Sequence, residues 1–257
     1  MLLAIDIGNT NMEFGVFDGG KMVASFRLGT NREITSDEVG LFTTQFFAIN
    51  GIDRHDIVDI IIASVVPQVM YSITNAMKKY FFQKQPLIVG DNIQMRIENR
   101  YDNPKDVGAD RLVAALAAYH KYGGPLIVVD FGTATTFDAI GRNGEYLGGA
   151  IYPGIKISMD ALFSKTAKLP RVELIRPEKI IGRNTITSLQ SGAVNGYIGA
   201  VTNIVNGIKA ELGEDTRAIA TGGLAKLVDD EGKIFSAIDR TLTLDGLRII
   251  YEENKRG

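Results

Sequence analysis

The chain has 257 residues, of which 45% are apolar and 23% are charged, the composition of an ordinary globular protein. Its formal net charge is −2, so no strong positive field is available to attract nucleic acid or an anionic membrane surface. Cysteine is absent and histidine occurs twice, which excludes disulfides and thiolate chemistry and argues against a multi-histidine metal site. We therefore expect neither a nucleic-acid partner nor a membrane partner.

The amino terminus lacks the features of a secretory signal. No cationic leader precedes the first apolar residues, and Asp6 interrupts them early. A signal peptide needs a longer apolar segment. The longest apolar stretches, 60–66 and 126–129, are far too short to span a bilayer. The sequence therefore predicts a cytoplasmic protein.

Hydrophobic periodicity predicts both strands and helices along the first part of the chain. An apolar strand over 2–5 leads to Asp6, and Ser36 is predicted to cap the first helix. Pro67 opens a second helix that is predicted to run to about Phe82. The other predicted elements are strands over 11–15, 21–28, 58–66 and 87–89, an irregular segment over 91–105 and a helix over 106–122.

The second part of the chain begins again with hairpin strands and continues with helices. This order, with strands and helices alternating after each hairpin, indicates an α/β protein with mixed sheets. The predicted elements are a meander of strands over 125–130, 135–140 and 146–151, helices over 154–167 and 186–212, a strand over 217–221, and a last helix over 244–254.

Two segments of the sequence resemble each other. Asp6-Ile7-Gly8-Asn9-Thr10 and Asp130-Phe131-Gly132-Thr133-Ala134 both follow an apolar strand, place Gly two residues after Asp, and lead into a second β segment. Similar hairpins at the head of two similar halves indicate a duplication. We predict the two halves to be 1–107 and 108–257, with the helix over 108–122 near their junction.

Each hairpin carries residues suited to phosphate and metal binding. Glycine permits a tight turn and close approach of a ligand to the backbone, and successive amide groups with short polar side chains can converge on phosphate oxygens. A carboxylate at the strand end, Asp6 or Asp130, can bind a hard cation such as Mg²⁺. A purely structural turn is the alternative for either hairpin alone. For the matched pair we expect a triphosphate and its metal to be held between the hairpins.

Other nucleotide-binding signatures are missing from the sequence. It contains neither a P-loop nor the Gly-x-Gly-x-x-Gly pattern of a dinucleotide site, so phosphate binding must come from the hairpins. Thr221-Gly222-Gly223, at a predicted strand end, offers small residues against which a purine or ribose could lie. A simple strand-to-helix turn explains the same residues.

Asp110 is the candidate general base. Gly108-Ala109-Asp110-Arg111 stands at the start of a helix with an apolar face, where an aspartate commonly serves as a cap. The alternative is catalytic: a carboxylate beside a phosphate site can accept the proton of a substrate hydroxyl, while the adjacent Arg111 binds an anionic group of the substrate.

Three glycines on the predicted helix over 186–212 suggest close packing against another helix. Gly192, Gly196 and Gly199 recur at helical spacing. This packing could lie inside the molecule or across a dimer seam.

A series of short motifs runs through the chain from end to end. Arranged in this order, they make the whole sequence resemble the type III pantothenate kinases of the acetate and sugar kinase/Hsp70/actin superfamily. The motifs are Asp6–Thr10, Tyr101-Asp102-Asn103-Pro104, Gly108–Arg111, Asp130–Thr135, Gly148-Gly149-Ala150, Pro153-Gly154, Lys168-Leu169-Pro170, Gly182-Arg183-Asn184-Thr185 and Thr221-Gly222-Gly223.

The resemblance implies two duplicated actin-like (ribonuclease H-like) domains and ATP-dependent phosphorylation of pantothenate to 4′-phosphopantothenate, the first step of coenzyme A biosynthesis. Asp110 would accept the proton of the pantothenate hydroxyl, and Arg111 would face the pantothenate carboxylate. The implied ATP and phosphate contacts are Asp6, Ile7, Gly8, Asn9, Thr10, Asn11, Met12, Glu13 and Thr133, and the implied pantothenate contacts are Tyr101, Gly108, Ala109, Asp110, Arg111 and Thr185.

The resemblance also implies cofactors and a partner. ATP would bind with Mg²⁺, which Asp6 would hold through water, and Asp130 would hold a monovalent cation, K⁺ or NH₄⁺. Members of the family are homodimers joined through helices of the second half. Thr185 would then contact pantothenate in its own subunit or in the neighbouring one.

Two other functions stay open. A kinase for a sugar or another small hydroxy acid would share the hairpins, although Tyr101 and Gly108–Arg111 argue against it. A non-catalytic regulator of the same fold, like the Bvg accessory factor, would not need a base. The intact set of Asp6, Asp110 and Asp130 therefore disfavours a regulator.

Overall fold

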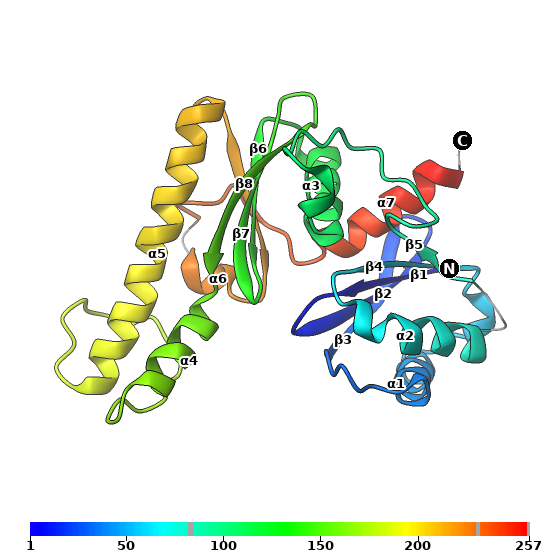
Figure 1. Cartoon of the computed structure of the whole chain (residues 1–257), viewed down its shortest axis with the longest axis horizontal. Coiled ribbons are helices and arrows are strands. Elements are labelled where there is room, and N and C mark those ends of the chain that lie inside the picture. Colours follow the sequence, from blue (N-terminus) through cyan, green and yellow to red (C-terminus); the bar gives the residue numbers. More distant parts are fainter. Residues whose placement is uncertain (82–84, 230–231, 256–257) are drawn as a thin grey trace. The chain divides into compact units, whose positions relative to one another are not determined.

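A computed structural model describes residues 1–81, 85–229 and 232–255 (Figure 1). The chain divides into two compact units. Unit 1 comprises Met1–Ile97, Asn103–Ala117 and Thr241–Gly257, and unit 2 comprises Glu98–Asp102 and Ala118–Arg240. The boundaries of these units differ from those of the predicted halves, 1–107 and 108–257. The halves concern the duplication from which the fold arose, and they stay a prediction.

Unit 1 is built on a mixed five-stranded sheet with the strand order β3-β2-β1-β4-β5. Its central strand β1 (Leu2–Ile7) pairs antiparallel with β2 (Asn11–Asp18) and parallel with β4 (Asp59–Ser64). The remaining strands are β3 (Lys21–Gly29) and β5 (Leu87–Ile88). β1 and β4 are buried along almost their whole length, the pattern of strands covered on both faces.

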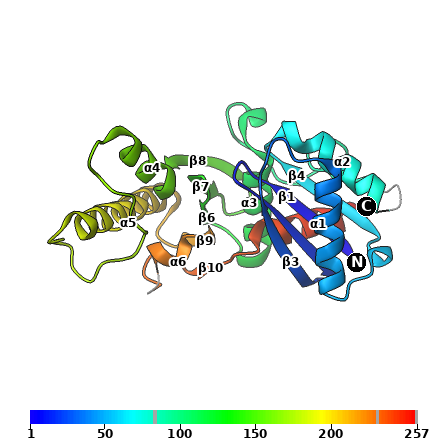
Figure 2. The same ribbon diagram turned by 90° about the horizontal axis from the view of Figure 1, so that it is seen from below.

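Helices cover both faces of this sheet (Figures 1 and 2). The side chains of Phe14 and Val16 on β2 belong to the core shared with α1 (Ser36–Ile49) and α2 (Pro67–Tyr80). Alternate residues of a strand point to opposite faces. Accordingly, Gly15 between them meets Leu244 of α7 (Leu242–Lys255) on the other side. Fully burying one such apolar side chain contributes about 1.5–3 kcal/mol.

The first two helices begin close to the predicted residues, with one difference. The N-cap of α1 is Thr35 rather than Ser36: the Thr35 hydroxyl accepts from the Glu38 N–H at 3.2 Å, and the Glu38 carboxylate accepts from the Thr35 N–H at 2.8 Å. This reciprocal capping box needs Ser or Thr three residues before Glu or Gln, and Ser36 lacks that spacing. α2 starts at Pro67 as predicted and ends at Tyr80. Its predicted end near Phe82 lies outside the described residues.

The segment after β5 is irregular, as predicted, and leads into α3 (Ala109–Tyr122). A 3₁₀ turn over Pro104–Asp106 precedes α3, so the helix begins three residues later than predicted. The Asn103 side chain caps this turn by accepting from the Lys105 N–H.

Unit 2 repeats the sheet of unit 1 with the strand order β10-β9-β6-β7-β8. β6 (Leu126–Phe131) pairs antiparallel with β7 (Ala134–Ile140) and parallel with β9 (Arg217–Gly222). β8 (Tyr146–Pro153) completes the predicted meander, and β10 (Ala237–Ile238) is a short strand that the sequence pattern did not predict. Two mixed sheets confirm the predicted α/β class.

Three helices complete unit 2. They are α4 (Ile155–Lys165), the long α5 (Thr185–Leu212) and the short α6 (Ala225–Val228). Figure 1 shows α5 running alongside the sheet, where its buried Tyr197, Val201 and Val205 join the core of Val129 and Phe137. No helix in the described part of the chain is both long and apolar enough to cross a membrane.

Asp6 and Asp130 occupy equivalent positions in the two sheets. Each is the fifth residue of a six-residue central strand. Asp6 lies opposite Glu13 on the antiparallel neighbour, and Asp130 lies opposite Thr136. The shared strand order and this shared register are what a duplication predicts.

Candidate functional site

The turn between β1 and β2 in unit 1 is held by a hydrogen bond within the turn and by hydrogen bonds from Thr30, the residue after β3. The Gly8 N–H donates to the Asn11 carbonyl at 2.9 Å. Thr30, just after β3, donates its N–H to the Thr10 carbonyl at 2.8 Å and its hydroxyl to the Gly8 carbonyl at 2.7 Å. The turn is therefore held in one conformation, with Asn9 and Thr10 exposed at its tip.

The predicted phosphate-binding residues do not all present their side chains. Ile7 and Met12 are fully buried in the core of unit 1, so only their main chain could reach a ligand. Glu13 forms an ion pair with Arg27 across β2 and β3. Asp6, next to Ile7, stands at the end of β1 and is partly exposed.

Asp110 lies near the carboxyl ends of the parallel strands β1 and β4. A Cβ added to Gly108 would lie 2.5 Å from the Asp110 Oδ1 and 3.3 Å from the Val65 side chain. Val65 follows β4 and donates its N–H to the Ile7 carbonyl at 3.1 Å. This chain of contacts runs from β1 through Val65 and Gly108 to Asp110. Ligands of open α/β sheets bind outside the carboxyl ends of parallel strands, and Asp110 is at such a position.

The electrostatic surroundings of Asp110 suit a proton acceptor. Burial raises the pKa of its carboxyl above the ordinary value, although the Arg111 N–H hydrogen bond, 2.8 Å from the Asp110 Oδ1, and the Arg111 charge act in the opposite direction. A base is most effective when its pKa approaches the working pH. Asp110 is the second residue of α3 and accepts from the N–H of the next residue, so it does not stand at the N-cap position, which precedes a helix.

In unit 2, glycines pack against the turn between β6 and β7. A Cβ at Gly154, the N-cap of α4, would lie 2.2 Å from the Thr133 carbonyl oxygen and 3.0 Å from the Gly132 carbonyl oxygen. The start of α4 therefore touches this turn. A helix N-terminus carries a partial positive charge that favours anions, which suits a phosphate neighbour for Thr133.

A second glycine touches the carboxylate of Asp130. Gly222 at the end of β9 has φ +88°, and a Cβ there would lie 2.8 Å from the Asp130 Oδ1 and 2.7 Å from the Phe131 carbonyl oxygen. The Asp130 carboxylate and the Phe131 carbonyl oxygen thus both lie close to the position that a side chain at residue 222 would occupy. Because residue 222 is glycine, that position is free of side-chain atoms. Oxygen ligands are those that hard cations take, so these residues fit a cation at Asp130.

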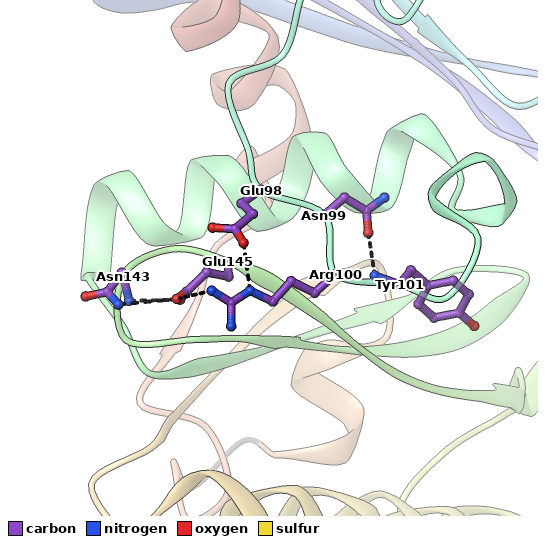
Figure 3. A network of polar contacts seen from close by, with 6 residues as sticks. All are labelled: Glu98, Asn99, Arg100, Tyr101, Asn143 and Glu145. Atoms are coloured by element: carbon purple, nitrogen blue, oxygen red, sulfur yellow. Dashed lines mark hydrogen bonds and ion pairs between the residues drawn. The ribbon is translucent and has the colours of Figure 1, made fainter.

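Tyr101 is held by a short segment that adds to the edge of β8. The Arg100 N–H donates to the Tyr146 carbonyl at 2.9 Å, and the Tyr146 N–H donates to the Glu98 carbonyl at 2.8 Å. The Asn99 Oδ1 accepts from the Tyr101 N–H at 3.0 Å. Figure 3 shows Glu98, Asn99, Arg100 and Tyr101 together with the ion pairs that Arg100 makes with Glu98 and Glu145.

The remaining predicted residues lie at helix starts. Arg111 follows Asp110 in the first turn of α3 and is partly exposed, beside Ala109. Thr185 is the exposed first residue of α5, directly after the N-cap Asn184. Within unit 1 the structure thus gathers the β1–β2 turn and Asp110, and within unit 2 it gathers Asp130 and Thr133.

Sequence reasoning missed three residues that shape these places. Thr30 holds the β1–β2 turn, Val65 links Ile7 to Gly108, and Tyr146 anchors the segment before Tyr101. Only Thr30 left a signal, because a hydroxyl at the end of the predicted third strand is well placed to bond the adjacent hairpin turn. The described residues contain no group of three His, Asp or Glu side chains arranged to hold a metal.

Comparison with known proteins places the chain in a family. The family model for type III pantothenate kinase matches residues 2–207. Among solved structures, the chain is similar to a protein described as a Baf family transcriptional activator from Campylobacter jejuni (21% identity, 99% of this chain and 100% of that one, TM-score 0.63). It is also similar to the ADPNP-bound activator of the 2-hydroxyisocaproyl-CoA dehydratase from Clostridium difficile (12%, 100% and 97%, TM-score 0.53) and to a ROK hexokinase from Thermus thermophilus (14%, 100% and 99%, TM-score 0.50).

These structural similarities show the fold, and they confirm the two duplicated actin-like domains that the resemblance implied. The family model covers most of the chain, from the first residue of β1 to the last third of α5. The chain therefore belongs to the type III pantothenate kinase family.

Proposed function

We propose that this protein catalyses the ATP-dependent phosphorylation of pantothenate to 4′-phosphopantothenate, the first step of coenzyme A biosynthesis. The observation that carries the proposal is the position of Asp110 in a chain of this family. Asp110 is a largely buried carboxylate with a raised pKa at the carboxyl ends of β1 and β4. Such a group suits proton transfer from a substrate hydroxyl.

In the proposed reaction, Asp110 accepts the proton of the pantothenate hydroxyl while that oxygen attacks the terminal phosphorus of ATP. The bond from this phosphorus to the bridging oxygen breaks, and ADP leaves. Arg111 binds the pantothenate carboxylate, because a guanidinium matches a carboxylate in fork geometry. Tyr101, Gly108, Ala109 and Thr185 are the other proposed pantothenate contacts.

The proposed ATP contacts are the turn after Asp6 in unit 1 and Thr133 in unit 2. The amide groups of the β1–β2 turn suit phosphate oxygens, and Thr30 holds that turn in place. Mg²⁺ near Asp6 would neutralise the charge of the phosphates. In proteins, Mg²⁺ is usually bound by one or two carboxylates together with substrate phosphates and water. Asp130 is proposed to hold a monovalent cation, K⁺ or NH₄⁺.

A direct assay tests this function. We expect the purified protein to convert pantothenate and ATP into phosphopantothenate and ADP in the presence of Mg²⁺ and K⁺, with most activity lost when Na⁺ replaces K⁺. Phosphopantothenate is measured by mass spectrometry and ADP by a coupled assay. A folded protein without turnover under these conditions would refute the proposal. Activity that ignores the monovalent cation would remove that role from Asp130.

The same assay separates the alternative functions. A panel of sugars and small hydroxy acids identifies another kinase if one of them is turned over faster than pantothenate. A non-catalytic regulator would retain its function in cells when Asp110 is replaced by Asn, since such a protein needs no base.

We also propose that the protein is a homodimer joined through unit 2. Among the described residues, a Cβ added at Gly192, Gly196 or Gly199 of α5 would meet nothing within 4 Å, so these glycines leave an unfilled strip on the helix. Near the start of α5, Ile180 and Ile181 are 74% and 81% exposed. A smooth glycine stripe beside exposed isoleucines suits close packing against a second copy.

Gly196→Gln tests this dimer. Gly196 is exposed and a Cβ there would meet nothing within 4 Å in the described part of the chain. Gln is also a better helix former than Gly, so the fold is expected to be as stable as before. The dimer is expected to weaken, which analytical ultracentrifugation over a concentration series measures. Gly20→Gln, in an exposed turn with equal space, serves as the control. Equal dimerisation of both variants would place the seam elsewhere.

A further inference from the structure

A buried carboxylate in unit 2 has no role in the proposed reaction. Asp138 on β7 is only 1% exposed. Its Oδ1 accepts a hydrogen bond from the Tyr146 hydroxyl at 2.8 Å, and its Oδ2 accepts one from the Thr136 hydroxyl at 3.1 Å. Removing a carboxylate from water costs free energy, which hydrogen bonds offset. The Tyr146 and Thr136 hydroxyls supply such bonds to Asp138.

Tyr146 links this carboxylate to the segment that carries Tyr101. It is fully buried and is the first residue of β8. Its main-chain N–H donates to the Glu98 carbonyl and its carbonyl accepts from the Arg100 N–H, so the segment pairs with Tyr146 on either side of Asn99. One residue thus fixes the backbone of this segment and, through its hydroxyl, bonds Asp138.

The ring of Tyr101 is placed by its contacts with the same strand. Its centroid lies 6.3 Å from that of the Tyr146 ring, with the planes inclined at 50°. A Cβ added to Gly148, whose φ is +118°, would lie 3.5 Å from the Tyr101 ring. The Tyr101 ring therefore packs against Gly148 of β8, next to the Tyr146 ring. A shift of the Tyr146 ring would be passed directly to Tyr101.

We propose that the hydrogen bond between Tyr146 and Asp138 positions Tyr101 and thereby sets the affinity for pantothenate. The inference rests on the proposed function, in which Tyr101 contacts pantothenate. Asp138 holds the hydroxyl end of Tyr146, and the Tyr146 ring in turn limits where the Tyr101 ring can lie. Tyr146 and Asp138 are positioning residues: they act on the substrate through Tyr101 without touching it.

Binding measurements on Tyr146→Phe test the effect on the substrate. The variant loses only the hydroxyl. We expect the Kd of pantothenate, measured by calorimetry, to rise about two- to tenfold, the scale of one lost hydrogen bond, while the Kd of ADP changes less than about twofold. Tyr152→Phe is the matched control, because Tyr152 lies on the same strand but contacts the ring of Tyr197. An unchanged Kd for pantothenate, or an equal rise for ADP, overturns the proposal.

A double-mutant cycle tests whether the effect passes through Tyr101. In a Tyr101→Ala background, Tyr146→Phe is expected to have no further effect on pantothenate binding, whereas an equal effect in both backgrounds contradicts the positioning role. Asp138→Asn retains an acceptor for the Tyr146 hydroxyl and should bind pantothenate almost as tightly as the wild type. Asp138→Ala should match Tyr146→Phe, and equal losses for Asn and Ala would contradict the inference.

A reporter that needs no substrate separates this inference from the proposed function. The chain contains no tryptophan, so Tyr101→Trp introduces a single tryptophan, whose emission can be observed separately from that of the tyrosines, at the position in question. Adding Tyr146→Phe is expected to shift its emission to longer wavelength and to increase its quenching by iodide, whereas adding Tyr152→Phe leaves both unchanged. An unaltered spectrum after Tyr146→Phe overturns the positioning role, whatever the substrate proves to be.

Discussion

Replacement of Asp110 by Asn is expected to lower the kcat of pantothenate phosphorylation by about 100- to 10,000-fold, the usual contribution of a general base. Asn has the shape of Asp and can still accept the Arg111 N–H through its side-chain oxygen, but it cannot accept a proton. The Kd of pantothenate is therefore expected to stay close to the wild-type value. Single-turnover kinetics and calorimetry measure the two quantities separately.

The same variant is expected to be more stable than the wild type at neutral pH. Burial raises the pKa of Asp110 in the folded protein, so folding disfavours the ionised carboxylate that the unfolded chain carries above about pH 4. Asn removes this penalty. The gain should shrink as the pH falls toward the unfolded pKa, because the wild-type carboxyl then becomes protonated. Urea unfolding at several pH values measures this trend.

Asp106→Asn is the matched control for both measurements. Asp106 is an exposed carboxylate just before α3 that accepts a hydrogen bond from the Asn103 side-chain amide. We expect its turnover within about twofold of the wild type and a stability change below about 0.5 kcal/mol. A wild-type rate in Asp110→Asn, or an equal loss in Asp106→Asn, would remove Asp110 from the role of base.

Gly222→Ala is expected to destabilise unit 2 and to impair cation binding together. At φ +88° an alanine is strained, at a cost of about 1–2 kcal/mol. Its Cβ would also press on the Phe131 carbonyl and the Asp130 carboxylate at 2.7 and 2.8 Å, and such overpacking costs about 1–3 kcal/mol. We expect a loss of about 2–5 kcal/mol in urea unfolding, and a higher K⁺ concentration for half-maximal activity.

Gly223→Ala separates the contact from the loss of a glycine. The neighbouring Gly223 does not have a positive φ, and a Cβ there would meet nothing within 4 Å. Its replacement should leave the K⁺ response unchanged and alter stability by less than about 1 kcal/mol. If both variants behaved alike, the contact between Gly222 and Asp130 would not be what matters.

The fold was largely predictable from the sequence because its strong patterns coincide with buried elements. The apolar runs at 2–5 and 126–129 became the central strands β1 and β6, which are buried on both faces. The short strand β10 was missed, since two residues carry no period that a pattern can detect. The cap at Thr35 was misplaced by one residue because its neighbour Ser36 is an equally good capping residue by type.

The sequence motifs predicted which residues belong to the candidate site, but they did not predict which of these residues contact one another. A motif names a run of residues, whereas the alternation of a strand sends every second side chain into the core. This is why Ile7 and Met12, inside the first motif, are fully buried. The approach of Val65 to Gly108 joins segments far apart in the chain, and no local pattern encodes it.

The segment from Glu98 to Arg100 also covers the first residue of the edge strand in the unit 2 sheet. β8 is the last strand in the order of that sheet, and an uncovered edge strand offers its amide and carbonyl groups to strands of other molecules. Glu98 and Arg100 occupy both main-chain groups of Tyr146. Proteolytic cleavage within this segment would therefore uncover the amide and carbonyl groups of Tyr146 as well as release Tyr101, so loss of activity is expected to follow cleavage.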